Sequence, residues 1–290
     1  MPTGILLLDK PAGLSSNAAL QKVRRAYAAA KAGHVGSLDP LATGMLPICL
    51  DEATKVAGDV LEGRKCYRFE VTLGRRTAAG DAEGDVVETR AVPQLERAAV
   101  EKVVAAFVGE RQQVPPMYSA LKREGQPLYR LARAGIEVER EARTIRIDRL
   151  DLYAIADDRL ELEMLCSKGT YVRTVAEEIA AALGTCGFVS RLRREWVEPF
   201  SSADMVTLDE VLAGALPGLL AADRALEHLP LVRLGVADAA RVRQGQTVQA
   251  EASSEPVRCR LYDERGRFFG IGERSAEGFV RPRRLLNLPL

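Results

Sequence analysis

The chain has 290 residues, of which 47% are hydrophobic and 28% charged, and its 41 basic and 40 acidic residues leave a formal net charge of +1. This composition is typical of a soluble globular protein, and such a length can bury about 75% of its unfolded surface in one large domain or in a large and a small one. No apolar run approaches the ~20 residues of a membrane span and the N-terminus lacks a basic signal segment, so the sequence predicts no membrane attachment.

The five cysteines are scattered along the chain and never stand in a C-x-x-C spacing. An odd number without that spacing argues against a disulfide framework and against a structural zinc site. A reducing, cytoplasmic compartment is therefore expected.

The charged residues are unevenly distributed along the chain. Nine basic and five acidic residues lie between Arg111 and Arg149, and eight arginines lie between Arg258 and Arg284, whereas acidic residues concentrate in 51–62 and 81–101. This asymmetry allows basic faces suited to phosphate contacts on a nearly neutral protein. For any one cluster, solvated surface of mixed charge is the alternative.

Hydrophobic periodicity and capping residues predict the first elements in chain order. The apolar run that ends at Asp9 is predicted to be the first strand. Ser15, Ser16 and Asn17 offer N-caps to a helix whose apolar positions continue to Ala30. Alternating apolar and polar residues then predict a half-buried strand over Cys66–Leu73.

The same signals predict three more helices and two more strands downstream. The first helix covers Leu95–Val108 and is closed by Gly109. The second covers Thr170–Leu183, with Thr170 as its cap and Gly184 at its end. The third is short and begins with a Thr207–Glu210 capping box. The strands lie around Ile145–Ile147 and over Leu160–Cys166. Because strands and helices interleave without a regular βαβ rhythm, we expect an α+β protein with a mixed sheet.

The pattern changes after residues 217–230. Short β-like runs at Val257–Tyr262, Phe268–Ile271 and Phe279–Leu286 alternate with glycine-containing turns. These features predict a domain boundary near residues 225–235 and a small β-rich second domain.

The segment 33–47 holds one aspartate, Asp39, among glycines and prolines. Glycine reaches positive φ freely, proline fixes φ, and Pro40 pushes Asp39 toward an extended backbone. The segment is thus either a loop built to present Asp39, or an Asx-type turn followed by a helix.

Five segments together resemble one known family. They are 9–17 (DKPAGLSSN), 33–47 (GHVGSLDPLATGMLP), 52–55 (EATK), 65–68 (KCYR) and 167–174 (SKGTYVRT). In this order and at these separations they resemble the TruB family, bacterial tRNA pseudouridine synthases that act on uridine 55. The resemblance runs from about Ile5 to the C-terminus.

The resemblance implies a pseudouridine-synthase domain over residues 1–228, with a central mixed, mostly antiparallel sheet flanked by helices and loops. It further implies an RNA-gripping insertion at about 114–143 and a PUA-like RNA-binding domain at 231–290. The expected partner is the T arm of tRNA, bound by a cytoplasmic monomer without an obligatory protein partner. Help with tRNA folding is an additional expected role.

The implied reaction breaks the C1′–N1 glycosidic bond of uridine, turns the uracil and rejoins it through C5. The substrate supplies every atom of the product, so no cofactor and no metal are expected. Asp39 matches the catalytic aspartate of the family, either as a nucleophile at C1′ or as a base that removes a ribose proton. Arg173 matches the active-site arginine of the family, and pairing with Asp39 would hold that carboxylate ionised and oriented. Because the helix dipole does not favour a cation in a first turn, a specific anionic partner for Arg173 is expected. Tyr67, a core tyrosine by pattern alone, matches the aromatic residue that stacks on the target base.

The resemblance also assigns substrate contacts, at His34, Tyr171, Leu192, Lys10, Lys168, Asp81 and Lys122. His34 matches a residue that fills the space left by flipped bases. Leu192 is expected to line the uracil pocket, and Lys10 and Lys168 serve either phosphates or loop packing. Asp81 lies in a segment that departs from the family, because Thr77-Ala78-Ala79-Gly80 replaces the usual Thr-Asp-Thr.

Two other functions compete with this one. The first is an RNA-binding or RNA-chaperone protein with a vestigial site, and the second is a guide-RNA-dependent enzyme that modifies ribosomal RNA. The presence of Asp39, Tyr67 and Arg173 disfavours the first, and the insertion at 114–141 disfavours the second.

Overall fold

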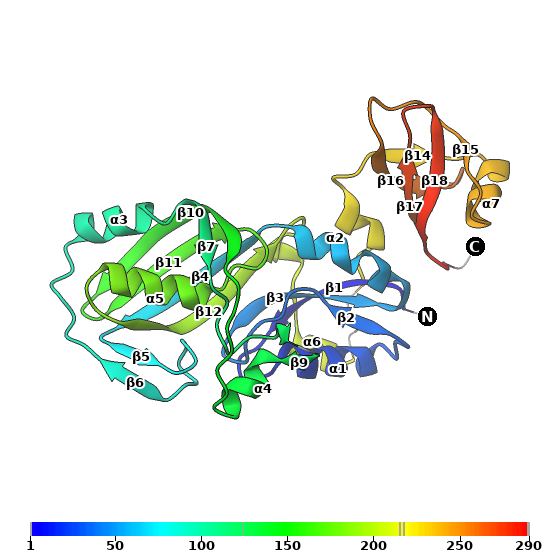
Figure 1. Ribbon diagram of the computed structural model, residues 1–290. Helices are drawn as coiled ribbons and strands as arrows, with labels where there is room; N and C mark the ends of the chain where they lie inside the picture. Colours follow the sequence, from blue (N-terminus) through cyan, green and yellow to red (C-terminus); the bar gives the residue numbers. More distant parts are fainter. Residues whose placement is uncertain (1, 124, 215, 217, 289–290) are drawn as a thin grey trace.

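The computed structural model describes residues 2–123, 125–214, 216 and 218–288, and its core is one large mixed sheet (Figure 1). Its strands are β1 (Gly4–Lys10), β2 (Ala32–His34), β3 (Thr43–Leu50), β4 (Lys65–Leu73), β7 (Gly109–Gln113), β10 (Arg143–Ala156), β11 (Arg159–Cys166), β12 (Gly187–Val197) and β13 (Val206–Thr207). Their order is β13-β1-β3-β12-β4-β11-β10-β7, with β2 paired to β3. Only the β1–β13 and β3–β12 pairs are parallel, so the predicted mixed, mostly antiparallel sheet is confirmed.

Helices and short hairpins surround this sheet. The helices of this part are α1 (Ser16–Ala26), α2 (Ala57–Glu62), α3 (Arg97–Ala105), α4 (Leu128–Arg133), α5 (Val172–Ala182) and α6 (Leu208–Leu212), with 3-10 turns η1 (Asp51–Val56), η2 (Ser202–Asp204) and η3 (Ala222–Leu226). The hairpins are β5 (Arg75–Thr77) with β6 (Val86–Thr89), and β8 (Lys122–Arg123) with β9 (Gln126–Pro127). The predicted insertion corresponds to β8, β9 and α4, which leave the sheet between β7 and β10 (Figure 1).

The main core lies between the sheet and the helices packed on it. Phe69 and Leu162, neighbours on β4 and β11, belong to the same buried cluster as Val175 and Ile179 of α5. Burying each such side chain contributes about 1.5–3 kcal/mol. Because α5 is anchored by this cluster, its first turn is a rigid support for Arg173.

The C-terminal part forms a separate five-stranded sheet. It contains β14 (Leu231–Arg233), β15 (Val248–Gln249), β16 (Val257–Tyr262), β17 (Phe268–Arg274) and β18 (Phe279–Leu285), with helix α7 (Val236–Arg243). One small apolar cluster lies wholly inside it, while a second joins its Phe268 and Ile271 to Ile5 and Met45 of the large sheet. The β-rich character of this part is confirmed, and its RNA-binding role remains a prediction.

Several helix boundaries differ from the sequence prediction. Helix α1 ends at Ala26 because Ala28 adopts a positive φ of 49°, and Arg24 donates to the carbonyls of the following turn. Helix α3 is shorter at both ends than predicted, and Gly109 opens β7 instead of closing the helix. The expected cap by Thr170 is wrong, since its hydroxyl donates to the Ser167 carbonyl and Tyr171 is the N-cap residue.

Other local predictions are confirmed. The Ser15 hydroxyl accepts the Ala18 N–H at the start of α1, and Thr207 and Glu210 form the capping box of α6. Gly184 follows α5 with a φ of 83°. Within the described ranges, every helix is too short or too polar to cross a membrane.

Candidate active site

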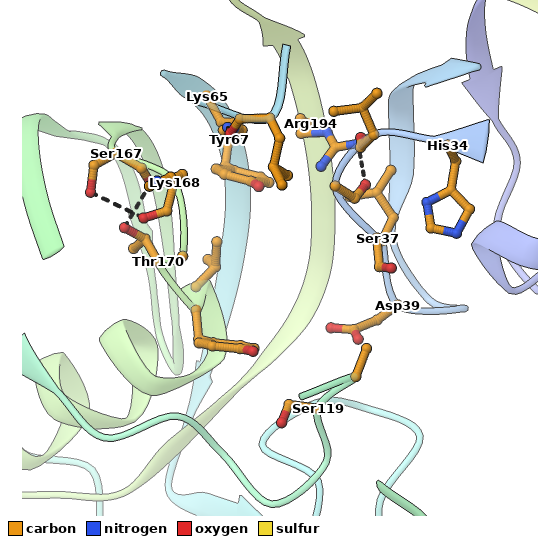
Figure 2. A pocket seen from close by; sticks show the side chains of 18 of the residues that line it. His34, Ser37, Asp39, Lys65, Tyr67, Ser119, Ser167, Lys168, Thr170 and Arg194 are labelled. Carbon is orange, nitrogen blue, oxygen red and sulfur yellow. Dashed lines mark hydrogen bonds between the residues drawn. The ribbon is translucent and has the colours of Figure 1, made fainter. Parts of the chain in front are cut away.

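The motifs that are far apart in the sequence meet around one cavity of about 580 Å³. Its walls come from the loop after β2, from β4 and β12, from residues 119–121 of the insertion and from the stretch 167–173 that leads into α5. Figure 2 shows Asp39 on one side of this cavity and Lys65 and Tyr67 on the other.

The loop that carries Asp39 connects β2 to β3, and hydrogen bonds from the start of α1 fix its position. The Ser16 hydroxyl both accepts the Leu38 N–H at 2.7 Å and donates to the Leu38 carbonyl at 2.9 Å. Gly44 has a φ of 97°, and a Cβ at this position would lie 2.2 Å from the Arg194 carbonyl oxygen. The loop therefore has a fixed shape, and the alternative of a turn followed by a helix is wrong, because a strand follows.

Arg173 binds the Asp39 carboxylate with two donors, although the residues are 134 positions apart. Its Nε lies 2.9 Å from Asp39 Oδ2 and its Nη2 lies 3.2 Å from Oδ1. The guanidinium also donates to the carbonyls of Ala79 at 2.6 Å and Tyr118 at 2.7 Å. Arg173 is 4% exposed, so this bidentate pair fixes where the carboxylate points.

Asp81 stands behind Arg173 and does not face the cavity. It is 4% exposed, its Oδ2 lies 3.7 Å from Arg173 Nη1, and its Oδ1 accepts the Glu83 N–H at 3.1 Å. Burial raises the pKa of this carboxyl, and the Arg173 charge opposes that shift. The carboxylate of Asp81 is thus turned inward to the guanidinium, and the substrate contact assigned to this residue stays a prediction.

Tyr67 and Leu192 form the apolar wall of the cavity. Tyr67 on β4 is half-buried, and burial raises the pKa of its phenol while the nearby Arg194 charge lowers it. Leu192 on β12 is 8% exposed and lines the same cavity. A flat aromatic ring beside an aliphatic side chain suits a planar heterocycle.

His34 lies at the end of β2 and also lines the cavity. Its Nδ1 is buried without a hydrogen-bond partner among the described residues. Burial and then the Arg194 charge lower the pKa of the imidazole, so the side chain is neutral at pH 7. Tyr171, the N-cap of α5, lines the cavity as well, and burial raises the pKa of its phenol.

The three lysines predicted to contact substrate differ in burial and in their distance from the cavity. Lys10 is 0% exposed, and its Nζ donates to the carbonyls of Pro11 at 2.8 Å and Leu14 at 2.7 Å. These contacts fit the alternative of loop packing, and the assignment of Lys10 to substrate stays a prediction. Lys168 is exposed at the cavity rim and pairs with Glu62. Lys122 is exposed on β8, outside the cavity.

Two buried cations that the sequence interpretation missed also line the cavity. Arg194 is 1% exposed, and its Nε donates to the Met45 carbonyl at 2.7 Å while its Nη2 donates to the Gly36 carbonyl at 2.9 Å. Lys65 is 5% exposed, and its Nζ donates to the Leu61 carbonyl at 2.6 Å. Period-2 alternation could have found them, since Lys65 shares a strand face with Tyr67, and Arg194 with Leu192.

The described residues contain no group of His, Cys, Asp and Glu side chains that could hold a metal ion. What they assemble is one carboxylate fixed by a guanidinium, facing an aromatic wall across a cavity large enough for a nucleotide base. This arrangement is a candidate active site for a planar ring substrate.

Comparison with known proteins gives the family. Residues 24–172 match the family described as TruB family pseudouridylate synthase (N terminal domain), residues 173–226 match the tRNA pseudouridylate synthase B C-terminal domain, and residues 230–286 match Pseudouridine synthase II TruB, C-terminal. The chain belongs to the TruB family of pseudouridine synthases, which are isomerases.

Individual relatives agree over nearly the whole chain. Proteins called tRNA pseudouridine synthase B are 48% identical in Pseudomonas putida and 49% identical in Pseudomonas fluorescens, each over 98% of this chain and 95% of the relative. A chain in a crystal structure of a Cbf5-Nop10-Gar1 complex has a TM-score of 0.75 at 23% identity, covering 99% of this chain and 86% of that one. This structural likeness shows the shared fold.

Proposed function

We propose that this protein converts uridine 55 in the T arm of tRNA to pseudouridine, acting as a cytoplasmic monomer. The observation that carries the proposal is the bidentate Arg173–Asp39 pair, which aims the Asp39 carboxylate into a base-sized cavity that Tyr67 also lines. The relatives named tRNA pseudouridine synthase B support tRNA as the substrate.

In the proposed reaction Asp39 starts the cleavage of the C1′–N1 bond. It either attacks C1′ and forms a covalent bond to the sugar, or removes the 2′ proton of the ribose. In both routes the bonding electron pair stays on the uracil, which then turns and bonds to C1′ through C5. The same step breaks the Asp39–C1′ bond or returns the proton to C2′, and the uracil finally loses the C5 proton and gains one on N1. Arg173 orients the Asp39 carboxylate for either route through two charge-assisted hydrogen bonds.

The remaining cavity residues hold a base that has been taken out of its helix. Tyr67 stacks on the uracil, and Leu192 excludes water from the reacting atoms. His34 is neutral and flat, which suits a side chain that fills the space left by flipped bases. Tyr171 and Lys168 contact the nucleotide at the cavity rim.

Basic residues outside the cavity grip the RNA backbone. Lys122 and Arg123 on β8, with Arg130 and Arg133 on α4, project from the insertion next to the cavity wall at Leu121. The arginine-rich domain at 231–290 adds further phosphate contacts. These contacts supply affinity, while Asp39 supplies the chemistry.

The test uses purified protein, unmodified tRNA transcript and no added cofactor or guide RNA. We expect pseudouridine at position 55 alone, and we expect the Asp39→Asn variant to bind the tRNA within about tenfold of wild type while forming product several orders of magnitude more slowly. Pseudouridine at another position, or comparable turnover by Asp39→Ala, would refute the proposal. Product that appears only after a guide RNA is added would instead support the guide-dependent alternative.

A further inference from the structure

Arg194 and Lys65 are buried cations whose partners are all neutral. The guanidinium of Arg194 binds the carbonyls of Met45 and Gly36, and the ammonium of Lys65 binds those of Leu61 and Gly63. Neither lies within 4.0 Å of a carboxylate in the part of the chain that the structure describes. The other two cations that line the cavity, Arg173 and Lys168, are each paired with a carboxylate.

Burying a charge without a counter-ion is costly, because the ion loses its hydration and gains no opposite charge. Placing two such charges together increases that cost, and burial and the Arg194 charge lower the pKa of Lys65 to about 8. Carbonyl dipoles offset part of the cost but bring no opposite charge. Such an arrangement suits a site where negative charge arrives during the reaction.

The positions of the two cations relative to Asp39 indicate where that charge would arrive. Arg194 is the cross-strand partner of Tyr67, and Lys65 precedes Tyr67 by two residues on β4. In Figure 2 the side chains of Lys65 and Tyr67 lie across the cavity from Asp39, with Arg194 beside them. Both cations therefore border Tyr67, and the Arg194 guanidinium lies between Tyr67 and the loop that carries Asp39, where it donates to the Gly36 carbonyl.

Charge balance in the proposed cleavage requires such a group. When the C1′–N1 bond breaks, its electron pair moves onto N1 and spreads over the O2 and O4 oxygens of the uracil. Asp39 loses its own negative charge in the same step, either by bonding to C1′ or by taking the 2′ proton. One unit of negative charge thus moves from Asp39 to the base, and Arg173, bound to Asp39, opposes this movement.

We propose that Arg194, assisted by Lys65, stabilises the negative charge on the detached uracil. This inference rests on the proposed glycosidic cleavage in the same cavity. A fixed cation that meets charge only as it develops lowers the barrier without tightening ground-state binding. Arg194 is already held by backbone carbonyls, so little reorganisation accompanies the reaction.

The experiment compares uridine with 5-fluorouridine at the target position of a synthetic T-arm RNA. Fluorine makes the uracil more acidic and therefore a better leaving group, which needs less stabilisation. Loss of the target nucleoside is followed in single turnovers with saturating enzyme. For Arg194→Met we expect the rate to fall about 100-fold with uridine but only about tenfold with 5-fluorouridine.

Three variants give the controls. Arg194→Lys keeps the charge with fewer donors, so its rate should lie between those of wild type and Arg194→Met. Lys65→Met should also lose more rate with uridine than with 5-fluorouridine. Arg193→Met removes the neighbouring arginine, which pairs with Asp9 outside the cavity, and should affect both substrates equally and by less than about threefold.

Equal losses with both nucleosides in Arg194→Met and Lys65→Met would overturn the inference and leave these residues a structural role. A weaker RNA affinity with a flatter salt dependence, at an unchanged rate, would overturn it in favour of phosphate binding. If Arg194→Met fails to fold, Arg194→Lys and Lys65→Met carry the same comparison. The proposed function fails separately, when Asp39→Ala retains turnover.

Discussion

Replacing Arg173 by methionine removes both donors to the Asp39 carboxylate and keeps an unbranched side chain in their place. Each hydrogen bond to a charged group is worth about 1.5–3 kcal/mol, so the two bonds at 2.9 and 3.2 Å correspond to about 3–6 kcal/mol. If that free energy orients the carboxylate for the reaction, pseudouridine formation should slow by roughly 10²- to 10⁴-fold.

A double-mutant cycle separates orientation from other roles of Arg173. Single-turnover rates at saturating tRNA are measured for wild type, Arg173→Met, Asp39→Asn and the double variant. Residues that act as one unit are strongly non-additive, so the double variant should be less than about tenfold slower than Asp39→Asn alone. Activity left in Asp39→Asn must be measurable, which a long incubation and sensitive mapping of pseudouridine allow.

Additive losses in the cycle would refute this reasoning, because Arg173 would then contribute without Asp39. Folding must be checked, since Arg173 is buried and its loss also removes the cation beside Asp81. Thermal melting and tRNA affinity provide that check, and Arg191→Met, a change of an exposed arginine on β12, is the matched control. This control should retain wild-type rate within about twofold.

Three further predictions follow from single residues. Lys122→Ala should leave the saturated rate unchanged and reduce the slope of log affinity against log salt by about 0.7–0.9, and an unchanged slope would remove Lys122 from the RNA contacts. The pKa of Lys65 is lowered from 10.5 to about 8, so between these pH values the unfolded chain binds the extra proton. The unfolding free energy of wild type, measured by urea titration, should therefore rise from pH 8 to 10.5 by up to about 3 kcal/mol relative to that of Lys65→Met. If the two proteins gave parallel curves of unfolding free energy against pH, the lowered pKa of Lys65 would be contradicted. Gly44→Ala should lower the melting temperature by about 5 °C or more, because the new Cβ would lie 2.2 Å from the Arg194 carbonyl oxygen and the residue has a φ of 97°. A melting temperature equal to that of wild type would show that the loop can shift to make room.

Much of the fold was predictable because its signals are local. The alternation along β4 and the capping box at Thr207 each depend on a few neighbouring residues, and the structure contains both. Helix ends were less predictable, because tertiary contacts decide them. Thr170 is a good N-cap residue by type, yet its hydroxyl is used by the Ser167 carbonyl in the turn before α5.

The site was predictable where a motif identifies a residue, and less so where burial decides the role. The contact between Arg173 and Asp39 was expected and is present. Lys10 and Asp81 were expected to face the substrate, but both are turned inward, and a sequence of mixed polar residues does not tell which way a side chain points. Strand alternation places Lys65 on the face of Tyr67 and Arg194 on the face of Leu192, but only the folded chain shows that both are buried without a counter-ion.

The two ends of the proposed charge movement are held by different elements of the fold. Asp39 and Arg173 are fixed by the loop after β2 and by the first turn of α5. Arg194 and Lys65 project from neighbouring ends of β12 and β4, and Arg194 also donates to the Gly36 carbonyl of the loop after β2. Main-chain carbonyls hold both of the latter cations, so their positions do not depend on the protonation of any acidic side chain. A cleavage that moves one negative charge between fixed cations needs little rearrangement of the protein, and rigid placement of both ends is what a large antiparallel sheet provides. The aromatic ring of Tyr67 lies on that same sheet, which explains why the stacking surface and the cations share one wall.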